Sequence, residues 1–278
     1  MTQFVLKIAT KDEKGLIYKI SKLIFARGLN IVKNDEFVGE GQFFFRAILD
    51  GEAILSGGFD AFVSELQGAL NGANIELREI RKKDIVIFAT KEAHCLGDLL
   101  IKHYSNELCA NIKAVISNHN ELAELVGKFD IPFHHISSEN LSRDAHESAI
   151  LEQLVAYKFD YIVLAKYMRI LSPEFVAHFK GQIINIHHSF LPAFIGANPY
   201  KQAFERGVKI IGATAHFVND DLDEGPIITQ AVLNVSHEDS WADMKKAGQN
   251  VEKNVLSKAL DLVFNDRIFI NKNKTIVF

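Results

Sequence analysis

Two neighbouring segments of the chain carry side chains that are suited to acyl chemistry. Asn185 and His187 lie two residues apart in Ile-Ile-Asn-Ile-His-His, and Asp223 lies in Leu-Asp-Glu-Gly-Pro. An amide N–H can stabilise an oxyanion, an imidazole can exchange a proton near neutral pH, and a carboxylate can hold that imidazole in one tautomer. Together these groups suit the cleavage of a formamide, in which charge builds on oxygen and the leaving nitrogen takes a proton.

The spacing of these residues predicts a shared site. Residues i and i+2 of an extended strand point to the same side, so Asn185 and His187 should face together. Asp223 belongs to a polar loop between two predicted strands, residues 213–218 and 227–233. Such a loop can reach over the end of the neighbouring strand, where the other two side chains lie.

Other interpretations of these residues are open. A histidine on an apolar strand is usually structural, and an acidic loop is usually solvated. A thiol nucleophile at Cys95, beside His94, is not expected, because adjacent residues of a helix or strand point apart. A metal site is conceivable by ligand type, but no ligand spacing such as HExxH is present, so none is predicted. Its ligands would be His187, His188, His216 and Asp223.

The composition is that of a globular protein with room for two domains. The chain has 278 residues, of which 48% are hydrophobic and 24% charged, and these fractions argue against extensive disorder. A net charge of -4 gives no electrostatic reason to expect a nucleic-acid partner. No apolar run approaches the roughly 18 residues of a membrane span, and no secretory pattern opens the chain, so no membrane partner is expected. Cys95 and Cys109 lack CxxC spacing, which predicts reduced thiols in the cytoplasm.

Residues 1–81 show the order βαββαβ. Apolar stretches rich in β formers alternate with two amphipathic helical stripes, the first of which should end at Gly28. This order predicts a small antiparallel sheet with two helices on one face. The strands are expected at residues 4–8, 30–37, 42–49 and 75–80, and the helices at 16–27 and 59–70.

The pattern of apolar residues changes after the charged junction at residues 81–84. Residues 82–278 are therefore predicted to form a second, larger domain. Near-continuous apolar runs alternate with helical stretches, which predicts a doubly wound, mostly parallel sheet covered on both faces. Ligands of such a sheet bind at the carboxyl ends of its strands, where Asn185 and His187 fall. Ser240 and Asp243 resemble a capping box before a long helix, and a hairpin should close the chain. The apolar runs are residues 85–89, 114–117, 133–136, 161–165 and 183–186.

The first domain resembles an ACT domain. The motifs that carry the resemblance are Gly15-Leu-Ile, Gly28-Leu-Asn-Ile and Gly41-Gln-Phe-Phe-Phe-Arg. It implies a ferredoxin-like fold that assembles through its sheet or helices, with a small amino acid as a possible effector; assembly alone is the alternative. Phe43 and Phe45 alternate toward one side of a sheet too small to shield itself. We therefore expect a homo-oligomer, dimeric or tetrameric, joined partly through this domain.

From about Lys83 onward the chain resembles the folate-dependent formyltransferases. The family's Asn-x-His motif and the Asp of its Leu-Asp-x-Gly-Pro segment match this sequence, as does Met168-Arg-Ile-Leu-Ser-Pro. The resemblance implies that 10-formyltetrahydrofolate is the substrate, with no metal and no further cofactor. The implied catalytic residues are Asn185, His187 and Asp223, and the implied folate-pocket residues are Arg169, Ile170, Leu171, Val218 and Asn219.

Departures from the transferase pattern indicate the hydrolytic branch of this family, the formyltetrahydrofolate deformylases. The first loop, residues 90–97, contains Glu92 and no glycine before its end, so it is a poor cradle for the phosphate of an amine acceptor. His188, the run at residues 193–200 and the ACT-like domain also resemble that branch. The resemblance implies release of formate and tetrahydrofolate for one-carbon and purine metabolism. Formyl transfer to an amine such as glycinamide ribonucleotide, or a non-catalytic amino-acid sensor, are the alternatives.

Overall fold

The chain folds into two compact units. The computed structural model describes residues 3–51, 58–193 and 198–278, so part of the sequence run at residues 193–200 lies outside the described residues. Unit 1 comprises Met1–Arg81 with residues 265–269 and 276–278, and unit 2 comprises Lys82–Phe264 with residues 270–275. In the part of the chain that the structure describes, no helix is long and apolar enough to cross a membrane.

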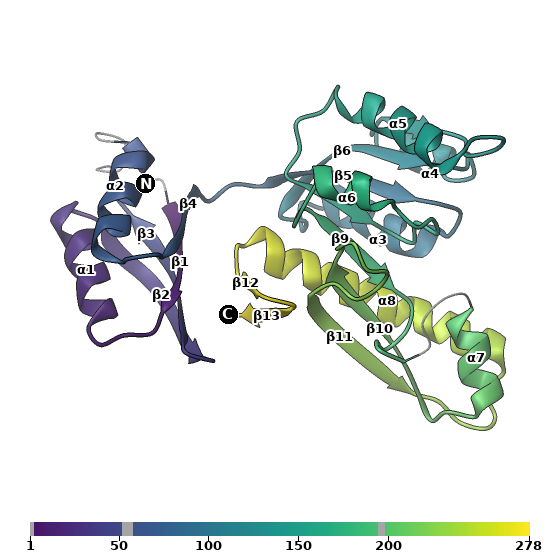
Figure 1. Cartoon of the computed structure of the whole chain (residues 1–278). Helices are drawn as coiled ribbons and strands as arrows, with labels where there is room; N and C mark the ends of the chain where they lie inside the picture. Colours follow the sequence, from purple (N-terminus) through teal and green to yellow (C-terminus); the bar gives the residue numbers. More distant parts are fainter. Residues whose placement is uncertain (1–2, 52–57, 194–197) are drawn as a thin grey trace. The chain divides into compact units, whose positions relative to one another are not determined.

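Unit 1 is the predicted βαββαβ sheet. Its four strands are antiparallel in the order β2-β3-β1-β4, so β2 and β4 form the two edges (Figure 1). Gly28 follows the first helix with a φ of 66°, a conformation that favours glycine and ends the helix as expected. The elements are β1 (Gln3–Lys11), α1 (Leu16–Ala26), β2 (Asn30–Gly39), β3 (Gln42–Asp50), α2 (Gly58–Ala69) and β4 (Asn74–Glu79).

The core of unit 1 corrects one expectation from the sequence. Phe43 and Phe45 are 4% and 2% exposed and pack with residues of both helices, such as Ile20 and Leu66, in one core cluster. The prediction that they present an apolar side for assembly is therefore wrong, because the helices of the same unit cover that side. On the other face of the sheet, Phe44 stacks edge-on against Phe269, with 5.5 Å between ring centroids.

Unit 2 contains a seven-stranded sheet in the order β11-β10-β9-β8-β5-β6-β7. The five neighbouring strands β9, β8, β5, β6 and β7 run parallel, whereas β10 is antiparallel to both β9 and β11. The prediction of a mostly parallel sheet is confirmed. The strands are β5 (Lys83–Ala89), β6 (Ala110–Ser117), β7 (Phe133–His135), β8 (Tyr161–Leu164), β9 (Ile183–His187), β10 (Ile210–Phe217) and β11 (Ile227–Asn234).

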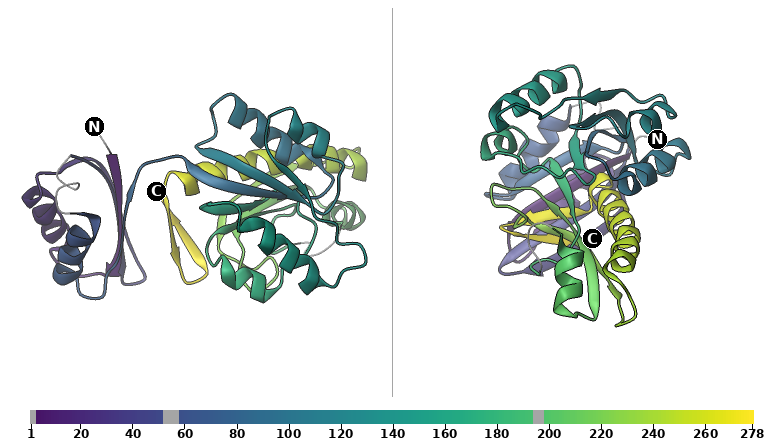
Figure 2. Two further views of the ribbon diagram at one scale, coloured as in Figure 1. Left: turned by 90° about the horizontal axis from the view of Figure 1, so that it is seen from above. Right: turned by 90° about the vertical axis from the view of Figure 1, so that its right-hand side faces the viewer.

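Helices cover both faces of this sheet (Figure 2). Alternate residues of the parallel strands, such as Val86 and Phe88, pack with Ile150 of α5 and Phe175 of α6, whereas α3 and α8 pack together on the other side. The helices are α3 (Ala93–Tyr104), α4 (Ala123–Gly127), α5 (Arg143–Leu154), α6 (Pro173–His178), α7 (Pro199–Arg206) and α8 (Trp241–Phe264).

Local signals set the beginning and end of several elements. The capping box before α8 is confirmed: the Ser240 amide and hydroxyl donate to Asp243, whose amide donates back to the Ser240 hydroxyl. Ser172 caps α6 by accepting a hydrogen bond from the Phe175 amide at 3.1 Å. The predicted closing hairpin is present as β12 (Ile268–Asn271) and β13 (Lys274–Val277).

The order of the strands defines where a ligand should bind. The chain runs from β5 through β6 to β7 on one side, then returns to β8 on the other side of β5. The loops after β5 and β8 therefore diverge and leave a crevice at the carboxyl ends of these strands, which we call the switch-point crevice. Ligands of doubly wound sheets bind at such a point.

Candidate active site

Asn185 and His187 lie near the carboxyl end of strand β9. In the parallel pair with β8, Asn185 lies opposite Leu164, the last residue of that strand. In the antiparallel pair with β10, Asn185 lies opposite His216 and His187 opposite Thr214. Both side chains line one pocket of about 290 Å³. The two residues that were predicted to share a site therefore border the same pocket.

The loop between β10 and β11 places Asp223 against His187. The Asp223 Oδ2 lies 3.1 Å from Nδ1 of His187. Two backbone features hold this loop close to β10: Asp223 has a φ of 58°, and a Cβ on Gly225 would lie 1.8 Å from the carbonyl oxygen of Phe217. Only glycine fits at residue 225, so the Asp-x-Gly spacing is a requirement of the loop's close approach to the strand.

The imidazole of His187 is oriented for proton transfer. Its Nδ1 faces the Asp223 carboxylate, and its Nε2 is buried without a hydrogen-bond partner among the described residues. A carboxylate only accepts hydrogen bonds, so Nδ1 carries the proton and Nε2 presents a lone pair. The ring therefore offers a base to the pocket that Asn185 also lines.

Asp223 is ionised at neutral pH. Burial alone would raise the pKa of its carboxyl, but the hydrogen bond with the His187 imidazole opposes burial, and that pKa lies well below its ordinary value. An ionised Asp223 fixes the tautomer of His187 and stabilises the imidazolium that forms when this ring takes a proton.

His216 is a site residue that the sequence did not single out for a role in this chemistry. Its Nδ1 lies 2.9 Å from the carbonyl oxygen of Phe217, and its Nε2 lies 3.2 Å from Nδ2 of Asn185. Because Nδ1 donates to the carbonyl, Nε2 accepts one N–H of Asn185. The second N–H of that amide is left for the pocket, so His216 orients the amide of Asn185.

The five predicted folate-pocket residues line the same pocket. It is bounded by the loop after β8 on one side and by the loop after β10 on the other. Hydrogen bonds fix the first loop: the Met168 amide donates to Thr90 at 3.0 Å, and the Ser172 amide donates to the buried Glu147 at 2.8 Å. The pocket residues include Arg169, Ile170, Leu171, Val218 and Asn219.

Comparison with known proteins separates two groups of relatives. A model of the formyl transferase family matches residues 83–260. The formyltetrahydrofolate deformylase of Haemophilus influenzae is 54% identical over 96% of this chain and 95% of its own length. The Escherichia coli K12 deformylase is 53% identical over 98% and 97%. The chain belongs to the formyltetrahydrofolate deformylase family.

Solved structures lead to the same division. A formyltetrahydrofolate deformylase from Pseudomonas syringae superposes with a TM-score of 0.95 and 38% identity, covering 100% of this chain and 95% of that one. Glycinamide ribonucleotide transformylase 1 from Symbiobacterium toebii gives a TM-score of 0.69 and 29% identity over 75% of this chain and 99% of that one. The deformylase relatives thus match both units, whereas this transformylase leaves a quarter of the chain unmatched.

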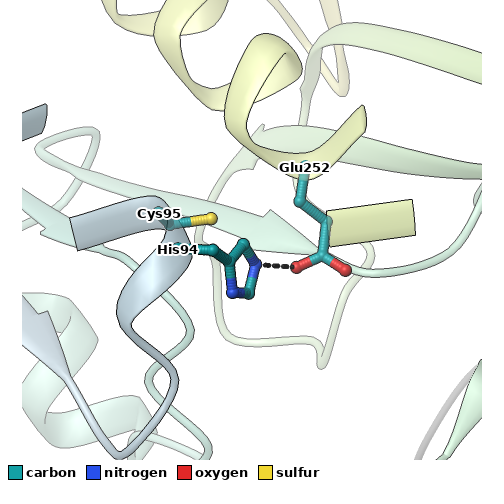
Figure 3. Close-up of side chains that lie close together, drawn as sticks. All are labelled: His94, Cys95 and Glu252. Carbon is teal, nitrogen blue, oxygen red and sulfur yellow. Dashed lines mark hydrogen bonds and ion pairs between the residues drawn. The ribbon is translucent and has the colours of Figure 1, made fainter. Parts of the chain in front are cut away.

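A buried charged cluster adjoins the pocket that Asn185 and His187 line. Glu252 of α8 is fully buried, and its carboxylate accepts a hydrogen bond from Nε2 of His94 at 2.7 Å (Figure 3). The same carboxylate accepts a hydrogen bond from the Tyr200 hydroxyl at 2.5 Å. The ammonium of Lys166 lies 3.3 Å from the same carboxylate and 3.7 Å from that of Glu92. We call Glu252, His94, Tyr200 and Lys166 the Glu252 network.

The geometry of His94 and Cys95 differs from the expectation. Side chains of adjacent residues were expected to point apart, yet ligand atoms of His94, Cys95 and Glu252 all lie within 4.8 Å of one another (Figure 3). The first turn of α3 is the cause, since there both side chains face α8. Burial raises the pKa of the Cys95 thiol, so this group is protonated and a poor nucleophile.

Among the described residues, His94, Cys95 and Glu252 are the one set that could hold a metal ion by distance. Their chemistry fits an ion poorly. The Lys166 ammonium already supplies the positive charge beside Glu252, and a metal needs the thiolate that burial disfavours at Cys95. His94 and Glu252 therefore belong to a charged hydrogen-bonded network, and the Cys95 thiol lies beside it.

His188 lies between the network and the pair of His187 and Asp223. Its ring centroid lies 5.4 Å from that of His187 and 6.0 Å from that of Tyr200. Burial, reinforced by the Lys166 ammonium, lowers the pKa of His188 to about 4. This ring is therefore neutral at pH 7 and places no second positive charge beside His187.

The Glu252 network predicts a specific loss of stability in acid. Burial alone would raise the pKa of Glu252, but the His94 hydrogen bond and the Lys166 ammonium lower it to about 2, from an ordinary value of 4.5. The stabilisation, about 3 kcal/mol at about 1.4 kcal/mol per unit, is present above pH 4.5 and lost as pH falls toward 2. Urea unfolding of Glu252→Gln, followed by the fluorescence of Trp241, should depend less on pH in that window. A pH dependence equal to that of the unmodified protein would contradict the prediction.

Proposed function

We propose that the protein hydrolyses 10-formyltetrahydrofolate to tetrahydrofolate and formate. The observation that carries the proposal is the arrangement of Asn185, His187 and Asp223 in one pocket, with a free His187 Nε2 and an ionised Asp223. The sequence identity to deformylases over both units supports it. The formate and free folate would serve one-carbon metabolism and purine synthesis.

The first half of the reaction would use all three residues. His187 Nε2 takes a proton from a water molecule, whose oxygen attacks the formyl carbon. The charge that develops on the formyl oxygen is stabilised by the free N–H of Asn185, and Asp223 stabilises the imidazolium of His187. A donor that is held in place before the reaction lowers the barrier because it need not reorient as the charge develops.

The second half breaks the C–N bond. The His187 imidazolium gives its proton to the nitrogen of the folate as this nitrogen leaves, and the formyl carbon departs as formate. Water supplies one oxygen and the protons balance, so the reaction needs no oxidant and no nucleotide. One histidine thus acts first as base and then as acid.

The folate would lie between the two loops that bound the pocket. Ile170 and Leu171 offer apolar surface for a flat ring, and Arg169 offers donors on the same loop. Across the pocket, Val218 adds apolar contact and the buried Oδ1 of Asn219 has no hydrogen-bond partner among the described residues. An unpaired buried acceptor suits a ring N–H of the ligand, because leaving it unpaired is unfavourable.

Formyl transfer to an amine is the second candidate, since transformylases share the fold. The first loop argues against it, because Glu92 precedes α3 where a phosphate would need bare amides. The test supplies glycinamide ribonucleotide at millimolar concentration and follows formate and formylated amine together. We expect formate release unchanged and no formylated amine. Transfer at a rate matching formate release would place the protein among the transferases.

We further propose that unit 1 binds a small amino acid and that the enzyme works in the cytoplasm. A cavity of about 470 Å³ lies between the β1–α1 loop and β2 and is lined by carboxylates of Asp12, Glu13 and Glu36 together with Phe37. Carboxylates can pair with the ammonium of an amino acid, and the phenyl ring can cover its side chain. Thiols at Cys95 and Cys109 suit a reducing compartment. Titration calorimetry with the common amino acids tests the binding.

We expect the protein to be a homo-oligomer joined partly through unit 1. The edge strand β2 exposes Val32, Phe37 and Val38 by 45–51%, and α1 exposes Phe25 by 83%. Edge strands with apolar side chains favour pairing with another chain. Sedimentation at micromolar concentration should give a dimer or tetramer, and Val38→Lys should shift it toward the monomer. A monomeric unmodified protein would contradict the prediction.

A further inference from the structure

The Glu252 network occupies the switch-point crevice. Glu92 precedes α3 in the loop after β5, and Lys166 lies in the loop after β8, so their ion pair joins the two loops that diverge there. Helix α8 contributes Glu252 from the sheet face that it shares with α3. The place where a doubly wound sheet receives its ligands is thus partly filled by side chains of the protein itself.

The folate pocket ends at this network. Among the described residues, its lining includes Lys166 and His188 but none of α3 or α8. The residues behind Lys166 are almost inaccessible to solvent: Glu252 is 0% exposed and Tyr200 6% exposed. Among the described residues, the folate pocket therefore has no opening past Lys166 toward Glu252.

The charges of the network resist displacement. Glu252 has three partners, Lys166 has two carboxylates, and Glu92 also pairs with Lys245 at 2.7 Å. A ligand that entered would have to separate buried opposite charges and replace each hydrogen bond. Leaving one such charge unpaired in the interior is strongly unfavourable. A substrate is consequently not expected to displace the side chains of the network.

We infer that the Glu252 network determines the specificity of the reaction by closing the switch-point crevice to an amine, so that only water reaches the formyl carbon. The inference rests on the proposed hydrolysis of 10-formyltetrahydrofolate and adds the residues that exclude the other nucleophile. If an amine entered, its nitrogen would attack the formyl carbon. The bond to the folate nitrogen would break, and that nitrogen would take the amine's proton. Rejection of one substrate by a filled site is a common basis of specificity.

The test opens the crevice from one side without unpairing a charge. His94→Ala removes an imidazole, while Glu252 keeps Tyr200 and Lys166 as partners. The full-length enzyme receives 10-formyltetrahydrofolate with a labelled formyl carbon and an excess of glycinamide, and the ratio of N-formylglycinamide to formate is measured. We expect the ratio to rise about tenfold or more in His94→Ala. This ratio does not depend on the fraction of folded enzyme or on its overall rate.

Matched variants separate the effect of the space left by a removed side chain from general damage to the enzyme. His94→Gln fills the space and can donate to Glu252, so its ratio should stay at the value of the unmodified enzyme. His237→Ala makes the same change at an exposed histidine and should also leave the ratio unaltered. Tyr200→Leu opens the crevice from the side of α7 and should raise the ratio if His94→Ala does not fold.

The outcomes distinguish the inference from the function on which it rests. An unchanged ratio in folded His94→Ala and in folded Tyr200→Leu would overturn the inference while leaving hydrolysis intact. Formylation of glycinamide by the unmodified enzyme as fast as formate release would instead refute the proposed function. A raised ratio in His94→Gln equal to that in His94→Ala would show that the space is not what excludes the amine.

Discussion

Replacing Asp223 with asparagine is expected to lower kcat roughly 10³- to 10⁴-fold while the fold is kept. The carboxylate contacts Nδ1 of His187 at 3.1 Å and leaves Nε2 free in the pocket. An asparagine would present an N–H to Nδ1, which favours the opposite tautomer and puts the proton on Nε2. His187 would then be unable to take a proton from water. Steady-state formate release, with the fold checked by circular dichroism, measures the effect.

The control for Asp223→Asn is the neighbouring carboxylate. Glu224→Gln makes the same chemical change one residue away, at an exposed side chain that does not line the pocket. It should leave kcat within about twofold, as expected for a surface position. Near-normal turnover in Asp223→Asn would remove this carboxylate from the mechanism, whatever the control shows.

Asn185→Ala is expected to lower kcat roughly 10²- to 10³-fold with little change in folate affinity. Its free amide N–H interacts with the formyl oxygen most strongly once that oxygen carries charge, so the loss falls on the transition state. Single-turnover rates and the Kd of 5-formyltetrahydrofolate, which is not a substrate in this mechanism, measure the two quantities separately.

Replacing His216, which contacts Asn185, should have a smaller effect on kcat. His216→Phe keeps a ring beside Asn185 but cannot accept its N–H, so the amide is oriented less well. We expect a loss of kcat that is smaller than that of Asn185→Ala, with no additional loss in the double variant. Additive losses would mean that His216 acts independently of Asn185. A large loss of folate affinity in Asn185→Ala would mean that this amide binds the substrate rather than the transition state.

Regular periodicity explains what could be predicted from the sequence. Apolar runs and their spacing determine the strands, and the i, i+2 rule places Asn185 and His187 on one side of β9. The loop carrying Asp223 was predictable for the same reason, because strands bound it on both sides. Some strands are longer than predicted: β6 begins at Ala110 and β10 at Ile210, where polar residues or glycine interrupt the apolar run.

Residues that depend on contacts between distant segments could not be predicted. His216 meets Asn185 only through the antiparallel register of β9 and β10, which no sequence spacing encodes. In the sequence, Glu252 lies beside the apolar stripe of α8, where a solvent-exposed side chain would be expected. Three partners from α3, α7 and the loop after β8 compensate its burial.

In unit 1, the sequence also could not predict what covers one face of the sheet. Alternation in Phe43-Phe-Phe45 predicts that the outer two side chains share a face, and they do, with their rings 6.3 Å apart and nearly parallel. Alternation cannot tell whether that face meets the protein's own helices or another chain. The helices α1 and α2 cover it here, so assembly through unit 1 has to use other residues.

In the proposed mechanism, water is the nucleophile in a pocket made by Asn185, His187 and Asp223. The most direct measurement is formate release from 10-formyltetrahydrofolate with no amine present, followed together with tetrahydrofolate. We expect the two products to appear in equal amounts over many turnovers and both to be lost in Asp223→Asn. An enzyme that produces no formate until an amine is added would contradict this mechanism.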